Sequence, residues 1–244
     1  LNSESLAWFE RLIDQYPESP FWVDSAYRVA TVMVEQERLP EAAQLLSRVL
    51  GKELQPTVKS SVLYLQGQIA AKQKEWILVT ESMEQLLTFA DDATVIAKAR
   101  YWLAESLYRQ EKYEVAEGIF QDLTKEDIGG DPALRPWIHL RLAQCLVHLE
   151  HWNQVLKIAN RCLQEESGFE AVYEFEFLVG RALSALGKLD DAREAFQNVV
   201  QSDRGKTTET AAIAQWRIGE TYFHQQEYKQ AIAAYCPNQN KASE

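Results

Sequence analysis

The chain has 244 residues, of which 46% are hydrophobic and 25% are charged. These proportions are typical of a folded globular protein and argue against a disordered chain. The formal net charge of −11 argues against nucleic-acid binding, which needs a basic surface to replace phosphate counterions. No apolar run approaches the roughly 20 residues of a membrane span, so we expect no membrane insertion. The acidic start at Leu1–Asp14 does not resemble a signal peptide, and the compartment stays open.

Helices and tight turns alternate along the chain, and residues 101–123 show the pattern most clearly. Apolar residues recur there at spacings of three and four, pause at Gln110–Lys112, and resume from Tyr113 to Leu123. This pattern predicts a helix, a tight turn and a second helix. The chain has only ten glycines and seven prolines, which favours long helices over a turn-rich β-protein.

The same pattern recurs at steps of 37 or 39 residues, which predicts a chain of helical hairpins. Each second helix contains a small or β-branched residue, the anchor: Ala42, Val79, Ala116, Val155, Ala192 and Ala231. A large apolar residue lies three positions before each anchor: Leu39, Trp76, Tyr113, Trp152, Leu189 and Tyr228. A small residue lies twelve positions before it, in the first helix: Ala30, Gly67, Ala104, Ala143, Gly180 and Gly219. Four positions after it lie Leu46, Met83, Phe120, Ala159, Phe196 and Tyr235.

The small residues predict how the two helices of a hairpin approach each other. We expect each small first-helix residue to pack against the anchor, while the large residue three positions before the anchor fills the space beside them. A glycine inside a helix costs about 1 kcal/mol relative to alanine, so close packing must outweigh that cost at Gly67, Gly180 and Gly219. One hairpin cannot bury its apolar stripe alone, so neighbouring hairpins must stack.

The register predicts a single solenoid over residues 1–235. Its parts are a half hairpin at 1–17, hairpins at about 20–55, 57–91, 94–127, 133–167 and 170–203, and a shortened hairpin at 208–236. The half hairpin follows because one period before Ala42 lies Ser5, so Phe9 and Leu12 match a second helix. We expect Pro237 to stop the last helix and residues 237–244 to form a disordered tail. This pattern is typical of a segment of a longer array, or of an array that ends unusually.

These columns resemble the tetratricopeptide repeat family. The matching residues are Leu103–Ala104, Leu107–Tyr108, Tyr113, Ala116 and Phe120, and then Ile218–Gly219, Tyr222, Tyr228, Ala231 and Tyr235. The resemblance implies an all-α, right-handed superhelical α-solenoid of antiparallel hairpins, with a concave groove that holds a protein or peptide partner. The period exceeds the usual repeat of about 34 residues, and such lengthened repeats resemble bacterial cell-envelope proteins, including the periplasmic repeat protein of the Tol–Pal system. The lysine and asparagine clamp of the chaperone-binding subset is replaced by Thr31, Gln68 and Glu105.

Two columns of the first helices, which line the inner face of such an array, carry aromatic residues and arginines. One column holds Tyr27, Tyr64, Tyr101, Leu140, Phe177 and Trp216, and the next holds Arg28, Leu65, Trp102, Arg141, Leu178 and Arg217. Aromatic and arginine side chains are enriched at binding hot spots. The predicted partner-binding residues are therefore Tyr27, Arg28, Tyr64, Tyr101, Trp102, Arg141, Phe177, Arg181, Trp216 and Arg217. In the alternative interpretation, the aromatic side chains pack one first helix against the next as core.

No group of residues predicts a catalytic, cofactor or metal site. His148 and His151 lie three apart without a third ligand, so we expect solvated turn histidines. Asp127 and Asp131 beside Gly129–Gly130 provide too few ligands for a calcium loop.

The remaining acidic pairs and the cysteines have structural interpretations. The pairs Asp91–Asp92, Glu165–Glu166 and Asp190–Asp191 are expected at helix ends or turns. Cys145 and Cys162 are expected to be buried free thiols on the two helices of one hairpin, and a disulfide between them is the alternative.

The sequence thus favours a protein-interaction scaffold that binds a peptide or helix of a partner in its groove. An architectural spacer, or a self-associating component of an envelope or secretion assembly, is the alternative, because the half hairpin and the shortened hairpin would expose apolar faces. We do not expect an enzyme, since catalysis would need a domain outside these residues.

Overall fold

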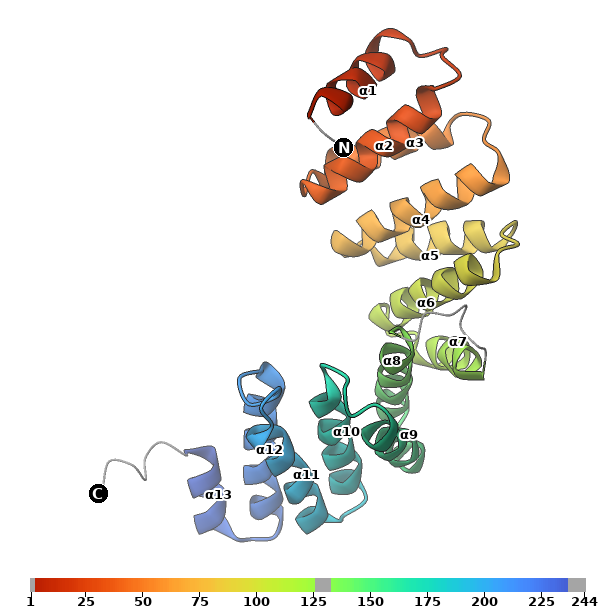
Figure 1. Cartoon of the computed structure of the whole chain (residues 1–244). Coiled ribbons are helices and arrows are strands. Elements are labelled where there is room, and N and C mark those ends of the chain that lie inside the picture. The colour runs from red at the N-terminus through yellow and green to blue at the C-terminus, as the bar shows by residue number, and fades with distance from the viewer. Residues whose placement is uncertain (1–2, 126–132, 237–244) are drawn as a thin grey trace. The chain divides into compact units, whose positions relative to one another are not determined.

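A computed structural model describes residues 3–125 and 133–236 of the chain. These residues form thirteen α-helices and no strand, which confirms the predicted all-α fold (Figure 1). The chain divides into two compact units, Leu1–Lys112 and Tyr113–Glu244. Residues 126–132 and the predicted tail at 237–244 lie outside the described residues. One continuous solenoid over residues 1–235 stays a prediction, as does the hairpin at 94–127.

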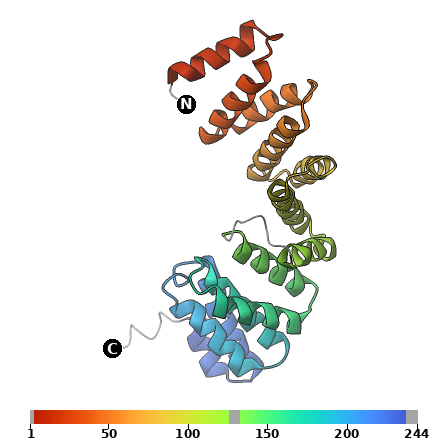
Figure 2. The same ribbon diagram turned by 45° about the vertical axis from the view of Figure 1, so that its right-hand side comes forward.

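The helices alternate between two types, as the repeat pattern predicts. The first helices of the hairpins are α2 (Trp22–Glu35), α4 (Pro56–Lys72), α6 (Ala93–Arg109), α8 (Arg135–His148), α10 (Val172–Ala185) and α12 (Glu209–His224). The second helices are α1 (Ser3–Gln15), α3 (Leu39–Leu50), α5 (Trp76–Leu87), α7 (Tyr113–Lys125), α9 (Trp152–Glu165), α11 (Leu189–Gln201) and α13 (Tyr228–Tyr235). Within each unit, every helix packs on the next one along the chain (Figure 2). A second helix such as α3 or α11 therefore lies between two first helices.

Each second helix from α3 onward begins at the large apolar residue that lies three positions before its anchor. The anchors are buried, and none of the six is more than 2% exposed. The start of the second helices and the burial of the anchors therefore confirm two of the predicted columns.

The turns inside the hairpins share one backbone conformation. In the first of them, Glu37 has a positive φ of 58°, its N–H donates to the Val34 carbonyl, and the Arg38 N–H donates to the Met33 carbonyl. This pair of hydrogen bonds is the Schellman motif, which satisfies the last carbonyls of a helix. The same position of the repeat has positive φ in the other five turns, at Lys74, Glu111, Glu150, Gly187 and Gln226. Only Gly187 adopts this conformation without a steric cost at Cβ.

Three first-helix glycines provide the space for a large side chain of the second helix. A Cβ added to Gly67 would lie 2.3 Å from Met83 Cε, one on Gly180 would lie 2.5 Å from Phe196 Cε1, and one on Gly219 would lie 2.4 Å from Tyr235 Cε1. The repeat pattern predicts the anchor at this place, but the residue four positions after the anchor occupies it. One turn of helix separates these two positions, so both face the same first helix.

The size of the two facing residues varies in a complementary way. Glycine faces Met83, Phe196 or Tyr235, whereas the same register pairs Ala30 with Leu46, and both of these residues are fully buried in one core cluster. A larger residue on one helix thus accompanies a smaller one on the other, which keeps the helices close and the interior densely packed.

His139 of α8 is a buried ionisable group in the second unit, with 6% of its surface exposed. Its Nε2 lies 2.7 Å from Arg161 Nη2 of α9, and its Nδ1 is buried without a hydrogen-bond partner among the described residues. Burial, and then the positive charges of Arg161 and Arg135, lower the pKa of His139 to about 4. The folded protein therefore holds this imidazole in its neutral form.

Replacing Gly180 by alanine should lower the free energy of unfolding by about 1 to 3 kcal/mol, because the fully buried Phe196 ring cannot move away from the new methyl group. Gly118 in α7 is the matched control, since no described atom lies within 4 Å of its added Cβ. Gly118→Ala should stabilise the protein by up to about 1 kcal/mol through helix propensity. Urea unfolding of the two variants measures both effects, and equal shifts in the same direction would contradict the packing described.

The protein should lose stability as the pH falls from about 6.5 to about 4, because the unfolded chain then binds a proton at His139 that the folded chain does not bind. The loss should amount to roughly 1 to 3 kcal/mol. Urea unfolding at several pH values measures it. His139→Gln should make the pH dependence shallower in this window, whereas His151→Gln, at an exposed position, should leave it unchanged. Parallel curves for the wild type and His139→Gln would contradict the assignment.

Candidate peptide-binding groove

A cavity of about 480 Å³ opens in the first unit beside α2, α4 and α6. The residues that line it come from these three helices and from the link between α5 and α6. They are Tyr27, Pro56, Thr57, Ser60, Ser61, Tyr64, Phe89, Ala90, Asp91, Asp92, Val95 and Lys98. The cavity therefore lies along first helices, where the sequence predicts the partner-binding residues.

Three of the side chains that line the cavity are aromatic and half-buried. Tyr27 and Tyr64 lie 37 residues apart, at the same position of consecutive repeats, and the fold brings them to one site. Phe89 joins them from the α5–α6 link, and Lys59 Nζ lies 5.2 Å from the centre of its ring. Half-buried aromatic rings still have apolar surface in contact with water. A ligand that covers this surface removes it from water, which favours binding.

A hydrogen bond between neighbouring repeats fixes the position of the Tyr64 ring. Trp102 Nε1 of α6 donates to the Tyr64 hydroxyl at 3.2 Å. Tyr101 in turn meets the Trp102 ring edge-on, with 5.8 Å between ring centroids. Of the predicted residues, Tyr27 and Tyr64 therefore line the cavity, and Trp102 and Tyr101 are connected to it through the Tyr64 hydroxyl.

The polar groups around the cavity bond largely to their own helices. Ser60 and Ser61 donate to the carbonyls of Pro56 and Thr57 at 2.9 and 3.2 Å. The Asp92 carboxylate caps α6 by accepting the Val95 N–H at 2.9 Å, which confirms the helix-end interpretation of this acidic residue. An apolar floor beside hydroxyl groups that already donate to their own helix suits an apolar side chain.

The predicted residues outside the cavity have different surroundings. Arg28 is exposed and pairs with Asp24 at 2.8 Å, with its guanidinium 6.0 Å from the Phe9 ring of α1. It is not among the residues that line the cavity.

The other predicted residues belong to the second unit and differ in accessibility. Phe177 is only 9% exposed and packs 5.7 Å from the Phe196 ring. Trp216 is 49% exposed, and the Arg217 guanidinium lies 5.1 Å from the centre of its ring.

Two of the three predicted arginines of the second unit have partners on their own helices. Arg217 pairs with Glu220 at 2.6 Å, and Arg141 donates to Gln144 at 2.6 Å. Both partners lie three residues further along the same helix, one turn away. Arg181 is half-buried.

Sequence reasoning missed Phe89 and Val95, which also line the cavity. Phe89 follows α5 in a link between hairpins, and these links vary in length, so no repeat column includes it. Phe89 lies two residues after Leu87, the last residue of α5. A large apolar residue in an otherwise polar link was the only signal in the sequence that could have identified it.

The histidine and cysteine interpretations agree with the structure. His148 and His151 are exposed, and His148 stacks on Tyr113 with 4.0 Å between ring centroids. Cys145 and Cys162 are buried free thiols on α8 and α9, and burial raises the pKa of Cys162 to about 11. Within residues 3–125 and 133–236, no group of three or more His, Cys, Asp or Glu residues could hold a metal ion. Asp127 and Asp131 lie outside those ranges.

The other acidic pairs also lie at helix ends. Asp190 and Asp191 belong to the first turn of α11, where carboxylates favour the helix dipole. Glu165 is the last residue of α9, and Glu166 follows it.

Comparisons with known proteins place this arrangement in a structural class. Among solved structures, the apo form of RapI superposes with a TM-score of 0.72 at 13% identity, covering 98% of this chain and 71% of that chain. YrrB, a TPR protein with an unusual peptide-binding site, gives a TM-score of 0.63 at 13% identity, with 85% of this chain and 97% of that chain covered. A Rap protein complexed with Competence and Sporulation Factor gives a TM-score of 0.62 at 15% identity. That match covers 99% of this chain and 76% of that chain. At these identities the likeness concerns the fold alone.

The sequence comparisons are more limited. No curated protein sequence matches the chain, and the predicted likeness to cell-envelope proteins stays a prediction. In the described part of the chain, none of the helices has the length and apolar character to cross a membrane.

The family model described as Tetratricopeptide repeat matches residues 84–131 and 178–236, which include α7, α11 and α13. The two matched segments and the alternating helical hairpins support the tetratricopeptide repeat family that the sequence pattern predicts.

Proposed function

We propose that this protein is an interaction scaffold that binds a peptide or a helix of a partner in the groove of its first unit. The observation that carries the proposal is the cavity of about 480 Å³, at which two residues of the predicted aromatic column meet. Tyr27 and Tyr64 would contact the partner directly, and Trp102 would hold the Tyr64 ring in place through its hydrogen bond.

The fold and its relatives support this proposal. YrrB has a peptide-binding site, and the Rap protein is complexed with Competence and Sporulation Factor, so chains of this fold do bind such partners. The cavity has a preformed aromatic floor, so little ordering is needed on binding, which lowers the entropic cost of association.

The surroundings of the cavity favour a partner with an apolar anchor side chain. Tyr27, Tyr64 and Phe89 offer ring surface, while the two adjacent aspartates of the α5–α6 link and Lys98 bring charges of both signs to the cavity. Opposite charges at the edge would orient a peptide by its own charged residues rather than select it by net charge. The main contribution to affinity would come from burial of the anchor.

Trp216 and Arg217 offer a further contact surface in the second unit. Trp216 is half exposed, and Arg217 lies beside its ring, which is a common arrangement of binding residues. Phe177, in contrast, is core, so we exclude it from this surface.

Replacing Tyr64 or Tyr27 by alanine should weaken partner binding by about tenfold or more, because each substitution removes an aromatic ring from the floor of the cavity. A phage-displayed library of random peptides, selected on the wild-type protein, supplies ligands, and calorimetry of the selected peptides measures the affinities. Tyr228→Ala is the control, since Tyr228 is an exposed tyrosine of the second unit.

Tyr64→Phe separates the two roles of Tyr64, because it keeps the ring and removes only the acceptor of the Trp102 hydrogen bond. It should weaken binding less than Tyr64→Ala does. If the peptides bind Tyr27→Ala and Tyr64→Ala as tightly as the wild type, the groove assignment is wrong.

A second candidate function is that of an architectural component that contacts its neighbours through α1 and α13. Its support is the exposure of large apolar side chains on these helices, with Trp8 67% and Ile232 64% exposed, because contiguous apolar surface of this kind marks interaction sites. Light scattering over a range of concentrations tests self-association. The mass should rise with concentration, and Trp8→Ser with Ile232→Ser should abolish the rise. A constant monomer mass would argue against self-association.

A further inference from the structure

A cluster of three polar side chains, outside the groove cavity, joins α6 to the preceding helix α5. The Thr80 hydroxyl of α5 lies 2.9 Å from the Ser106 hydroxyl of α6. Gln110, which follows the last residue of α6, donates its Nε2–H to the Thr80 hydroxyl at 2.8 Å and to the Trp76 carbonyl of α5 at 3.2 Å. Thr80, Ser106 and Gln110, the α5–α6 polar cluster, are not among the residues that line the cavity.

The burial of this polar cluster makes it sensitive to the position of α6. Ser106 is fully buried, and Thr80 and Gln110 are half-buried. A buried polar group that loses its partner costs free energy, and a hydrogen bond weakens steeply when its distance or angle changes. Apolar contacts are non-directional and tolerate small shifts better. The polar cluster therefore restricts the position of α6 relative to α5.

The second unit has a polar pair at the same positions of the repeat. Arg193 of α11 corresponds to Thr80, one residue after the anchor, and Thr221 of α12 corresponds to Ser106, two residues after the small residue. Arg193 Nε donates to the Thr221 hydroxyl at 3.1 Å, and Thr221 is 1% exposed. The remaining boundaries have Ala43 with Ile69, Glu117 with Cys145, and Leu156 with Ala182 at these positions. Hydrogen-bonding pairs are thus a feature of two boundaries and are not required for hairpins to stack.

Helix α6, which the polar cluster holds, contributes to the groove in two ways. Val95 and Lys98 of α6 line the cavity together with Tyr64 of α4. Trp102, one turn after Lys98, donates to the Tyr64 hydroxyl at 3.2 Å. In the first unit α6 packs on α5 and also contacts α4 (Figure 1). A shift of α6 would therefore change both the lining of the cavity and the support of the Tyr64 ring.

We propose that Thr80, Ser106 and Gln110 are positioning residues of the groove, whose hydrogen bonds hold α6 where a bound peptide needs it. The proposal rests on the proposed function of the groove, and it adds residues that do not touch the peptide. A preformed site loses less conformational freedom on binding. Loosening α6 therefore weakens binding even though every side chain that lines the cavity is still present.

A purely structural role of the polar cluster is the alternative, and the second unit supplies the matched control for it. Ser106→Ala and Thr221→Val each remove a buried hydroxyl that bonds a first helix to the preceding second helix. Both variants should therefore lower the midpoint of urea unfolding. Only Ser106 belongs to a helix that lines the cavity, so only Ser106→Ala should also change peptide affinity.

Calorimetry measures the affinity of peptides that are selected on the wild-type protein and that Tyr64→Ala binds more weakly. Ser106→Ala and Thr80→Val should each weaken binding by about threefold or more. Thr221→Val should leave the affinity within about twofold of the wild type, because its site is in the other unit. Thr80→Ser keeps the hydroxyl and should bind the peptides like the wild type, and circular dichroism verifies that each variant is folded.

Three results would overturn the proposal while the groove assignment stands. The first is wild-type affinity of both Ser106→Ala and Thr80→Val for peptides that depend on Tyr64. The second is equal weakening by Ser106→Ala and Thr221→Val, because the effect would then follow overall stability. The third is binding by Thr80→Ser that is as weak as binding by Thr80→Val. If no selected peptide depends on Tyr64, the groove assignment fails and this proposal fails with it, so the response to Tyr64→Ala distinguishes the two failures.

Discussion

Close contact between a small residue of one helix and a large residue of the next determines how the described hairpins pack. Where the first helix has glycine, as at Gly67, Gly180 and Gly219, the side chain of Met83, Phe196 or Tyr235 occupies the place of the missing Cβ. Each glycine lowers the stability of its helix by about 1 kcal/mol relative to alanine. Burial of the aromatic ring or the thioether away from water offsets that cost. The separation of the helices, and with it the position of every groove residue, depends on this contact.

Much of the fold follows from the spacing of small and large residues in the sequence. The columns predict where each second helix begins and which residues are buried, because periodic burial of a stripe is a property that the sequence carries directly. Spacing does not show which of two residues, one turn apart, meets the glycine, since both face the same helix. The positive φ of residues such as Glu37 and Lys74 is also invisible in the sequence, because glycine marks only one of the six turns.

The candidate site is less predictable than the fold. Tyr27, Phe177 and Trp216 share one repeat column, yet the first lines a cavity, the second is core and the third is half exposed. The difference arises from the neighbouring helix. Residues of α12 such as Ala214 and Ile218 belong to the same core cluster as Phe177 and help to cover it. Trp216 lies on α12, which is the last first helix among the described residues. Phe89 could not be predicted because it lies in a link of variable length. The repeat column thus predicts the position of a residue on its helix, whereas the packing of the adjacent helix determines whether its side chain is accessible to a ligand.

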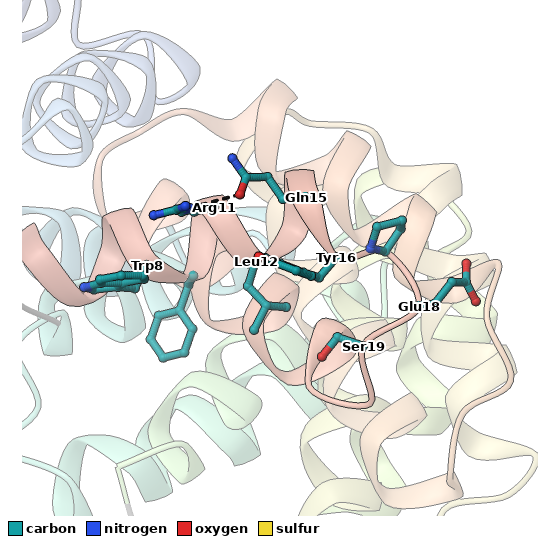
Figure 3. Close-up of a pocket in the computed structure, with 9 residues that line it drawn as sticks. Trp8, Arg11, Leu12, Gln15, Tyr16, Glu18 and Ser19 are labelled. Atoms are coloured by element: carbon teal, nitrogen blue, oxygen red, sulfur yellow. Dashed lines mark hydrogen bonds between the residues drawn. The ribbon is translucent and has the colours of Figure 1, made fainter.

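The two proposed interaction surfaces have a common physical origin. In a stack of hairpins, each helix is stable because the next one covers its apolar stripe. Among the described residues, apolar surface is accessible at the cavity that Tyr64 lines beside the first helices α2, α4 and α6, and along α1 at the hollow that Trp8 and Leu12 line (Figure 3). Both surfaces are preformed by the same packing that holds the hairpins together, so a partner would add to the stack with little rearrangement.

A double-mutant cycle at Gly180 and Phe196 tests the central claim most directly. Phe196→Leu with Gly180→Ala changes this pair into the alanine and leucine pair that the chain already has at Ala30 and Leu46. If small and large residues compensate each other, the double variant should be more stable than the sum of the two single effects implies, by about 1 kcal/mol or more in urea unfolding. Strictly additive effects would contradict the account, because the two positions would then contribute to stability independently.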